Sequence, residues 1–302
     1  MKGMRRWLVA VLALVAAAPA GAAEVFILKS SEQPGFRAVV DALRRAGPGH
    51  AFTEFDLAGN RAQGERIVAP LRGRAVILVA LGALAAQAAR AALPDAPLVF
   101  CMVPDPEKAG LSAAPHVAGV AAQVPLKNQL AAFRLVNPRG VRIGVLHGPD
   151  TADSIEEARK AARLVRVALV PRRIASERDV PQTMRELLAG EEAVDAVWIM
   201  ADPVLVTEQT RRYILGEALK AGRPVYAYSD TLIPEGALVS DAPDPASVGQ
   251  QVAELVDRLA AGERNLRDML VPRAELVINK KIAGKLKIEI PADALKAANR
   301  VF

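Results

Sequence analysis

Apolar residues recur along the chain in short continuous runs that alternate with longer amphipathic stretches. Runs such as "VILVAL" (76–81) and "PLVFCMV" (97–103) are typical of strands covered on both faces, as in a parallel sheet. The stretch "PGFRAVVDALRRA" (34–46) instead repeats apolar residues at helical spacing. This alternation of strand and helix predicts an α/β fold made of doubly wound lobes.

The expected elements fall into two similar halves. Strands are expected at residues 24–30, 50–57, 75–81, 97–103 and 116–122, and then at 142–148, 166–174, 195–202, 224–230 and 237–242. Helices are expected at residues 34–46, 61–71, 84–93, 126–136, 152–165, 180–188, 204–220 and 245–261. A length of 302 residues suits two lobes, and the second is expected to begin near Pro125.

The first 23 residues, "MKGMRRWLVAVLALVAAAPAGAA", have the composition of an export signal. Three basic residues precede an apolar run at 7–18, and small residues follow that allow cleavage after Ala22 or Ala23. The apolar run is shorter than the roughly 20 residues that span a bilayer. A permanent N-terminal anchor is the alternative. We expect a signal peptide at 1–23 and a periplasmic protein without a permanent membrane anchor.

Charge and cysteine content narrow the expected partners. The formal net charge of +6 falls to +3 without the three basic residues of the signal peptide, and the remaining basic residues are scattered. Nucleic acid is therefore not an expected partner, and the export signal occupies the place where a regulator of this fold would carry a helix-turn-helix. Cys101 is the only cysteine, so no internal disulfide can form.

No catalytic, nucleotide-binding or metal-binding pattern is present in the sequence. The chain lacks a GxxxxGK[ST] phosphate loop, a GxGxxG turn after a strand and a GxSxG nucleophile elbow. Its three histidines, His50, His116 and His147, lie far apart and show no metal-ligand spacing. We therefore expect a protein that is not an enzyme and that needs no cofactor.

The remaining signal for function is the set of polar or small residues that follow the expected strands. In open parallel sheets, ligands bind at the carboxyl ends of the strands, where helix N-termini attract anions and aspartates suit an ammonium group. The candidate ligand-binding residues are Ser30, Ser31, Gly82, Ala83, Asp105, Gly148, Asp150, Asp202, Tyr228, Ser229, Asp230 and Asp241. For each of them a turn or helix-cap role is the competing interpretation, most clearly for Asp105, which stands between two prolines.

Several stretches together carry a family likeness. "ILVALGALAAQAARAALPDAPLVFCMVPDPEKAGL", "HVAGVAAQVPLKNQLAAFRLVNPRGVRIGVLHGP", "RPVYAYSDTLIPEGALVS" and "ELVINKKIAGKLKIEIPADAL" occur in this order. They resemble the ABC-transporter substrate-binding proteins of the tryptophan/phenylalanine-binding type over nearly the whole chain after the signal peptide. The sequence departs from the family pattern where "GSPAAQ" is "GALAAQ" and where "ADN" is "ADP", so the likeness supports the fold more than the ligand.

The resemblance implies a class I periplasmic binding-protein fold, in which two Rossmann-like lobes are joined by three crossovers and close over a ligand. The crossovers would fall near residues 119–125, 238–243 and 270–275. Lobe I would then comprise 24–121 plus 242–272, and lobe II 122–241 plus 273–302.

The expected function is that of a periplasmic binding protein that delivers a small polar or zwitterionic ligand, such as an amino acid, to an ABC permease in the inner membrane. We expect a monomer. The alternatives are a periplasmic sensing module for a receptor or histidine kinase and, more remotely, an exported hydrolase. Neighbouring permease and ATPase genes would separate transport from sensing, whereas the sequence does not.

Overall fold

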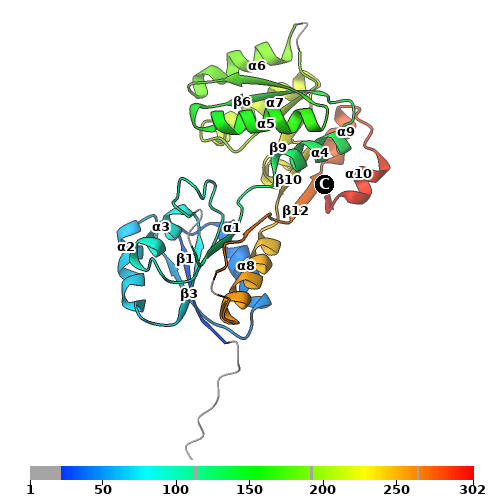
Figure 1. Cartoon of the computed structure of the whole chain (residues 1–302). Helices are drawn as coiled ribbons and strands as arrows, with labels where there is room; N and C mark the ends of the chain where they lie inside the picture. Colours follow the sequence, from blue (N-terminus) through cyan, green and yellow to red (C-terminus); the bar gives the residue numbers. More distant parts are fainter. Residues whose placement is uncertain (1–21, 112–114, 191–192, 264) are drawn as a thin grey trace, which may run out of the picture.

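The chain folds into two α/β lobes, each built on its own sheet (Figure 1). This computed structural model describes residues 22–111, 115–190, 193–263 and 265–302, so most of the expected signal peptide lies outside the described residues. Among the residues described, no helix is long and apolar enough to cross a membrane. The expected α/β class with two doubly wound lobes is confirmed.

Lobe I is built on a sheet of six parallel strands in the order β11-β5-β4-β3-β1-β2. The strands are β1 (Glu24–Lys29), β2 (Ala51–Asp56), β3 (Val76–Leu81), β4 (Leu98–Cys101), β5 (Val117–Val120) and β11 (Met269–Leu270). The helices are α1 (Pro34–Ala46), α2 (Arg61–Val68), α3 (Ala83–Ala92) and α8 (Pro245–Ala260). Helices α1 and α8 bury apolar residues against one face of this sheet, and α2 and α3 cover the other.

Lobe II is built on seven strands in the order β13-β12-β10-β9-β8-β6-β7, of which only the pair β10 and β12 is antiparallel. The strands are β6 (Arg142–His147), β7 (Ala168–Arg173), β8 (Ala196–Ile199), β9 (Val225–Ala227), β10 (Val239–Pro243), β12 (Ala274–Ile278) and β13 (Arg300–Val301). The helices are α4 (Leu126–Val136), α5 (Ala152–Leu164), α6 (Val180–Leu188), α7 (Glu208–Lys220), α9 (Lys280–Lys285) and α10 (Ala292–Ala297). Helices α4 and α5 pack on one face and α6 and α7 on the other.

The chain crosses between the lobes three times. It leaves β5 through residues 121–125 to enter α4, returns at Asp244 from β10 to α8, and passes from β11 through residues 271–273 to β12. In Figure 1, α8 therefore lies beside α1 in the lower lobe although it follows the strands of the upper lobe in sequence. This connectivity confirms the expected arrangement of two lobes joined by three crossovers.

Most of the predicted elements are found at the predicted positions. Helix α7 is an example of an element whose predicted start is wrong. Its apolar pattern predicts a start at residue 204, but the helix begins at Glu208. The Asp202 carboxylate accepts the Val204 N–H at 2.8 Å and holds this segment in a turn, and the Thr207 hydroxyl then caps the helix by accepting the Thr210 N–H. Local hydrogen bonding thus decides the boundary.

Candidate ligand-binding cleft

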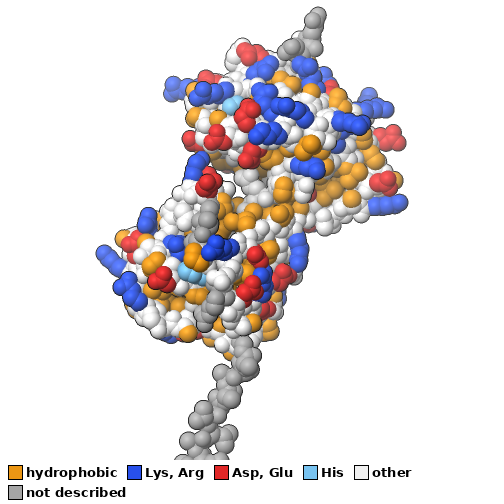
Figure 2. All heavy atoms as spheres, viewed as in Figure 1, with side chains coloured by type: hydrophobic (Ala, Val, Ile, Leu, Met, Phe, Trp, Pro, Cys, Tyr) orange, Lys and Arg blue, Asp and Glu red, His pale blue; other side chains and the backbone are white. Residues whose placement is uncertain are grey.

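A cavity of about 460 Å³ lies between the two lobes and is lined by residues of both. Its lining includes the carboxyl ends of strands in each sheet, the first turn of α3 and the crossover that enters α4. Figure 2 shows hydrophobic side chains gathered at the narrow waist where the chain passes between the lobes. The lining residues are Ser30, Gln33, Phe36, Gly82, Ala83, Leu84, Met102, Pro104, Ala122, Gln123, Val124, Leu126, Gln129, Trp198, Met200, Ala201, Tyr228 and Pro243.

The lobe I wall of the cleft holds the N-terminus of α3 in place through Ser30. The Ser30 hydroxyl donates to the Leu81 carbonyl at 3.0 Å and accepts the Ala85 N–H at 3.0 Å. Ser30 therefore satisfies the third amide of α3, while Ala83 and Leu84, the first two residues, line the cavity. The first amides of a helix have no partner within the helix, so those of Ala83 and Leu84 suit an anionic group.

Gly82 is required between Ser30 and α3. Its φ of +88° lies in the left-handed region, which favours glycine. A Cβ at this position would lie 2.6 Å from the Ser30 hydroxyl oxygen and 3.2 Å from the Phe36 ring. The glycine therefore permits the close approach of β1 and α3 that forms this wall.

We expect the Ser30→Ala variant to lower the free energy of unfolding by about 1–2 kcal/mol, because the buried Ala85 N–H loses its acceptor. Thermal denaturation would measure this loss. The neighbouring Ser31→Ala variant is the matched control, because the Ser31 hydroxyl accepts one exposed hydrogen bond, from the Gln33 side chain at 3.2 Å, and no other among the residues described. Equal stability of the two variants would contradict the role given to Ser30.

The rest of the cleft wall is mainly apolar and includes large side chains from both lobes. Phe36 and Met102 come from lobe I, and Trp198 and Met200 from lobe II. The Trp198 ring packs edge-on against Phe133 with centroids 5.8 Å apart. A search for polar residues after strands does not find this wall. The sequence features that could have indicated this wall are the apolar residues next to the predicted strand ends and Trp198, the one tryptophan after the signal peptide.

Asp241 lies beside the cleft on β10, outside the residues that line the cavity but on the same face of the strand as Pro243, which does line it. Only 7% of the residue is exposed, and its carboxylate makes no hydrogen bond or ion pair with any residue the structure describes. Burial raises the pKa of Asp241 above its usual range. In the β9–β10 register Ser240 pairs with Ala227, which places Asp241 next to Tyr228 of the cleft lining.

Two of the expected ligand residues, Gly148 and Asp202, form a structural tie in lobe II instead of lining the cavity, and a third, Asp150, also lies outside the lining. Asp202 is 1% exposed and accepts the Gly148 N–H at 2.7 Å and the hydroxyl of Thr151. This carboxylate joins the loops that follow β6 and β8. Asp150 is exposed in the short turn at Pro149–Thr151.

The remaining expected ligand residues lie outside the cavity lining and have hydrogen-bond or ion-pair partners within the protein. Asp105 accepts the Lys108 N–H at 2.9 Å, which lowers the pKa of this carboxyl group, and it lies outside the cavity lining. Ser229 accepts the Thr231 N–H, and Asp230 pairs with Arg300. Of the expected set, the cleft lining brings together Ser30, Gly82, Ala83 and Tyr228.

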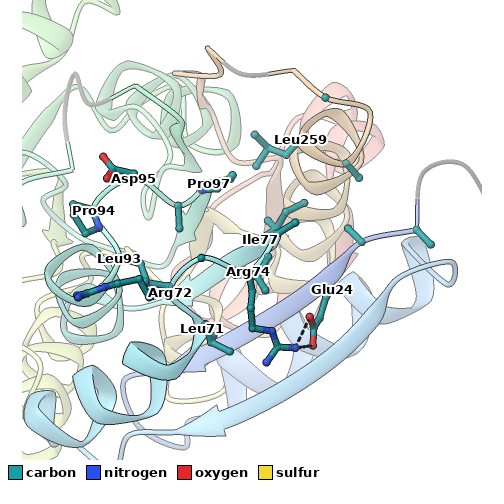
Figure 3. Close-up of a pocket in the computed structure, with 18 residues that line it drawn as sticks. Glu24, Leu71, Arg72, Arg74, Ile77, Leu93, Pro94, Asp95, Pro97 and Leu259 are labelled. Carbon is teal, nitrogen blue, oxygen red and sulfur yellow. Dashed lines mark hydrogen bonds and ion pairs between the residues drawn. The ribbon is translucent and has the colours of Figure 1, made fainter. Parts of the chain in front are cut away.

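A larger cavity of about 700 Å³ lies in lobe I at the amino ends of β1 and β3, opposite the strand ends that line the cleft (Figure 3). Its charged groups include Arg74, whose guanidinium is already paired with Glu24 at 2.7 Å, and Arg72, which donates to the Ala92 carbonyl. No group of three or more potential metal ligands occurs among the residues that the structure describes. The inter-lobe cleft is therefore the better candidate for ligand binding.

Comparison with known proteins identifies the family. The family model for ABC transporter substrate binding proteins matches residues 26–302. A tyrosine-binding protein of Clostridioides difficile (strain R20291) is 22% identical over 233 residues, which cover 73% of this chain and 66% of that protein, just under two thirds of its length.

Two solved structures are similar in fold. The domain of Streptococcus pneumonia in complex with L-Trp has a TM-score of 0.68 at 19% identity and covers 93% of this chain and 100% of that one. The ligand-free, open structure of a substrate-binding protein with adhesive properties from Clostridium difficile has a TM-score of 0.78 at 20% identity, covering 92% and 99%. The two-lobed topology is that of class I periplasmic binding proteins. This chain belongs to the ABC transporter substrate-binding protein family, whose members bind their substrates without catalysing a reaction.

Proposed function

We propose that this protein binds an amino acid with a large apolar or aromatic side chain in the inter-lobe cleft and delivers it for import. The observation that carries the proposal is the composition of the cleft, where an apolar and aromatic wall adjoins the first amides of α3 on one lobe. Beside the cleft on the other lobe lies the buried carboxylate of Asp241, which has no partner among the described residues. A cavity of about 460 Å³ is in the size range of small-molecule sites. The tyrosine-binding relative and the L-Trp complex support the same ligand class.

The two charged groups of an amino acid have separate partners in this proposal. The α-carboxylate accepts hydrogen bonds from the amides of Ala83 and Leu84, at the positive end of the α3 dipole. The α-ammonium group pairs with Asp241, whose carboxylate is otherwise buried with no partner in the part of the chain that the structure describes. Such a pair is stable only when both charges are desolvated together, which closure of the lobes over the ligand would accomplish.

The ligand side chain occupies the apolar wall. Phe36, Met102, Trp198 and Met200 offer ring and thioether surfaces that an aromatic or long aliphatic side chain can contact. A sugar would leave its hydroxyl groups unpaired against this surface, so the wall disfavours it.

The proposal places the protein in the periplasm, exported by a cleavable signal peptide and released as a monomer. Its partner is an ABC permease in the inner membrane that recognises the ligand-bound, closed form. A fractionation experiment that found the protein in the cytoplasm would contradict this part of the proposal.

Trp198 provides a direct test of ligand binding. The chain has two tryptophans, and Trp7 lies in the expected signal peptide, so the exported form carries Trp198 alone. We expect a saturable change in indole emission when L-phenylalanine, L-tyrosine or L-leucine is added and none with ribose. Calorimetry extends the series to L-tryptophan. Saturable binding of ribose, or the absence of any amino acid binding, would overturn the proposal.

The carboxylate site has its own variant and control. Leu84→Glu places a negative charge beside the α3 amides, and like-charge repulsion should lower amino acid affinity at least tenfold, or about 1.4 kcal/mol. Leu164→Glu makes the same change at a position that is 69% exposed near the end of α5, and we expect it to leave affinity unchanged. Equal affinities in the two variants would place the ligand carboxylate elsewhere.

A further inference from the structure

We infer that the signal peptide ends at Ala22, one residue before the boundary expected from the sequence, so that the mature protein begins at Ala23. We infer further that the new N-terminal ammonium group is held by His50, whose ring is in turn held by Asp257. This assigns a processing position and an amine-binding contact on lobe I that are separate from the ligand cleft. The inference rests on three elements that meet at the start of the lobe I sheet, namely β1, the residue before β2, and α8.

The contacts form a continuous chain of hydrogen bonds. The Ala23 N–H donates to His50 Nδ1 at 3.1 Å, and His50 Nε2 lies 2.7 Å from the Asp257 carboxylate. Because Nδ1 accepts a hydrogen bond from the backbone, Nε2 is the nitrogen that donates to the Asp257 carboxylate. The His50 side chain is only 6% exposed and packs edge-on against Phe52, which holds the ring in this orientation.

Among the described residues, Ala23 is also the first that forms a hydrogen bond of the lobe I sheet. Its carbonyl accepts the Ala51 N–H at 3.0 Å, one step before the first β1–β2 pair of Glu24 and Ala51. Ala22 and Ala23 both line the cavity of Figure 3 at this edge of the sheet. A chain that began at Glu24 would leave both His50 Nδ1 and the Ala51 N–H without these partners.

The sequence around the same bond suits cleavage between Ala22 and Ala23. A signal peptidase requires small residues in an A-x-A pattern, and Ala20, Gly21 and Ala22 supply it directly before this bond. Cleavage after Ala23 would place Gly21 at the first position of that pattern. Hydrolysis of the bond by water leaves a carboxylate on Ala22 and an ammonium group on Ala23.

Cleavage at this bond would strengthen an existing contact instead of breaking one. The neutral amide that donates to His50 becomes a charged ammonium group, and charge-assisted hydrogen bonds are the stronger kind. The imidazole then lies between a positive group and the Asp257 carboxylate, which is 59% exposed. The ring thereby links the start of β1 to α8.

The first test is the intact mass of the full chain after export from a Gram-negative host. We expect the mass of residues 23–302. A mass that corresponds to a start at Glu24 or at any other residue, or to the uncleaved chain, would overturn the inference.

The second test is a double-mutant cycle on thermal stability, with chains that begin at Ala23 or Glu24 and carry either His50 or His50→Gln. We expect His50→Gln to lower the melting temperature by about 2–4 °C in the chain that begins at Ala23. The same substitution should have a clearly smaller effect in the chain that begins at Glu24, because the contact is already absent there. Additive effects would show that His50 does not hold the N-terminus.

Discussion

The Asp241→Asn variant should bind amino acids about 30-fold or more weakly than the wild type, and its ligand-free form should nevertheless melt at a higher temperature at neutral pH. Truncating one partner of a buried, hydrogen-bonded charge pair costs about 2 kcal/mol or more of binding free energy. The ligand-free protein gains stability because asparagine removes a buried carboxylate that has no partner among the described residues. Calorimetry and thermal denaturation measure the two effects separately.

The buried carboxylate of Asp241 should also make the stability of the ligand-free protein depend on pH. Burial raises the pKa of Asp241, so the folded protein binds a proton more readily than the unfolded chain does. In the unfolded chain an aspartate has a pKa of about 3.9. The wild type therefore loses stability as the pH rises from this unfolded value through the raised folded value. The advantage of Asp241→Asn should be largest above that window and should vanish below pH of about 4.

The ionisation of Asp241 should also control ligand affinity, but affinity should rise with pH where the stability of the ligand-free protein falls. An ammonium ligand binds the ionised carboxylate, so wild-type affinity should fall as the pH drops through the raised pKa of Asp241, whereas the asparagine variant should show no such dependence. Asp150→Asn is the control, because it makes the same change at a carboxylate that is exposed instead of buried. If Asp241→Asn bound amino acids as tightly as Asp150→Asn, the proposed ammonium site would be wrong.

The Gly249→Ala variant should be strongly destabilised although alanine favours helices. Gly249 lies in α8 where that helix packs on α1, and a Cβ there would stand 2.3 Å from the Val39 carbonyl oxygen and 2.7 Å from the Ala42 Cβ. The obstacle is backbone, so the two helices must separate and open the apolar layer that covers one face of the lobe I sheet. We expect a loss of about 2 kcal/mol or more, seen as a melting temperature about 4 °C lower or more.

A matched glycine in lobe II separates packing from helix propensity. Gly216 is in the middle of α7, and a Cβ at this position would meet nothing within 4 Å. Gly216→Ala should therefore raise the free energy of unfolding by up to about 1 kcal/mol. If both substitutions changed the melting temperature in the same direction, the close contact between α1 and α8 would not be the cause of the Gly249 effect.

The elements themselves were accessible from the sequence because their signals are local. The helices at Pro34–Ala46, Leu126–Val136 and Val180–Leu188 begin and end at the residues that their apolar spacing predicts. No helix or strand was expected after residue 261, where the structure has β11, β12, α9, α10 and β13. The five-residue strand β12 and the two short helices were missed, and so were the two shortest strands, β11 and β13. Each has two residues, too few to show a periodicity, and forms only by pairing with a strand of the sheet that it joins.

The candidate site was accessible only in part. The rule that ligands lie beyond strand ends led to Ser30, Gly82 and Tyr228, which do line the cleft. The same rule led to Asp105, whose carboxylate caps its own loop through the Lys108 N–H. Position after a strand is a local property, whereas facing the other lobe depends on how the two sheets are placed.

Asp202 and Asp241 show what could not be predicted about the site from the sequence. The sequence places both after an apolar run in lobe II, but in the structure Asp202 follows β8 whereas Asp241 lies within β10, and both are almost fully buried. Asp202 finds its partner in the backbone of Gly148, 54 residues away, whereas Asp241 finds none among the described residues. The family, the two α/β lobes and the strand ends follow from periodicity and motif order along the chain. Which buried carboxylate remains free for a ligand is decided only when distant segments meet, because a hydrogen-bond partner is a matter of position in space and not of spacing in the sequence.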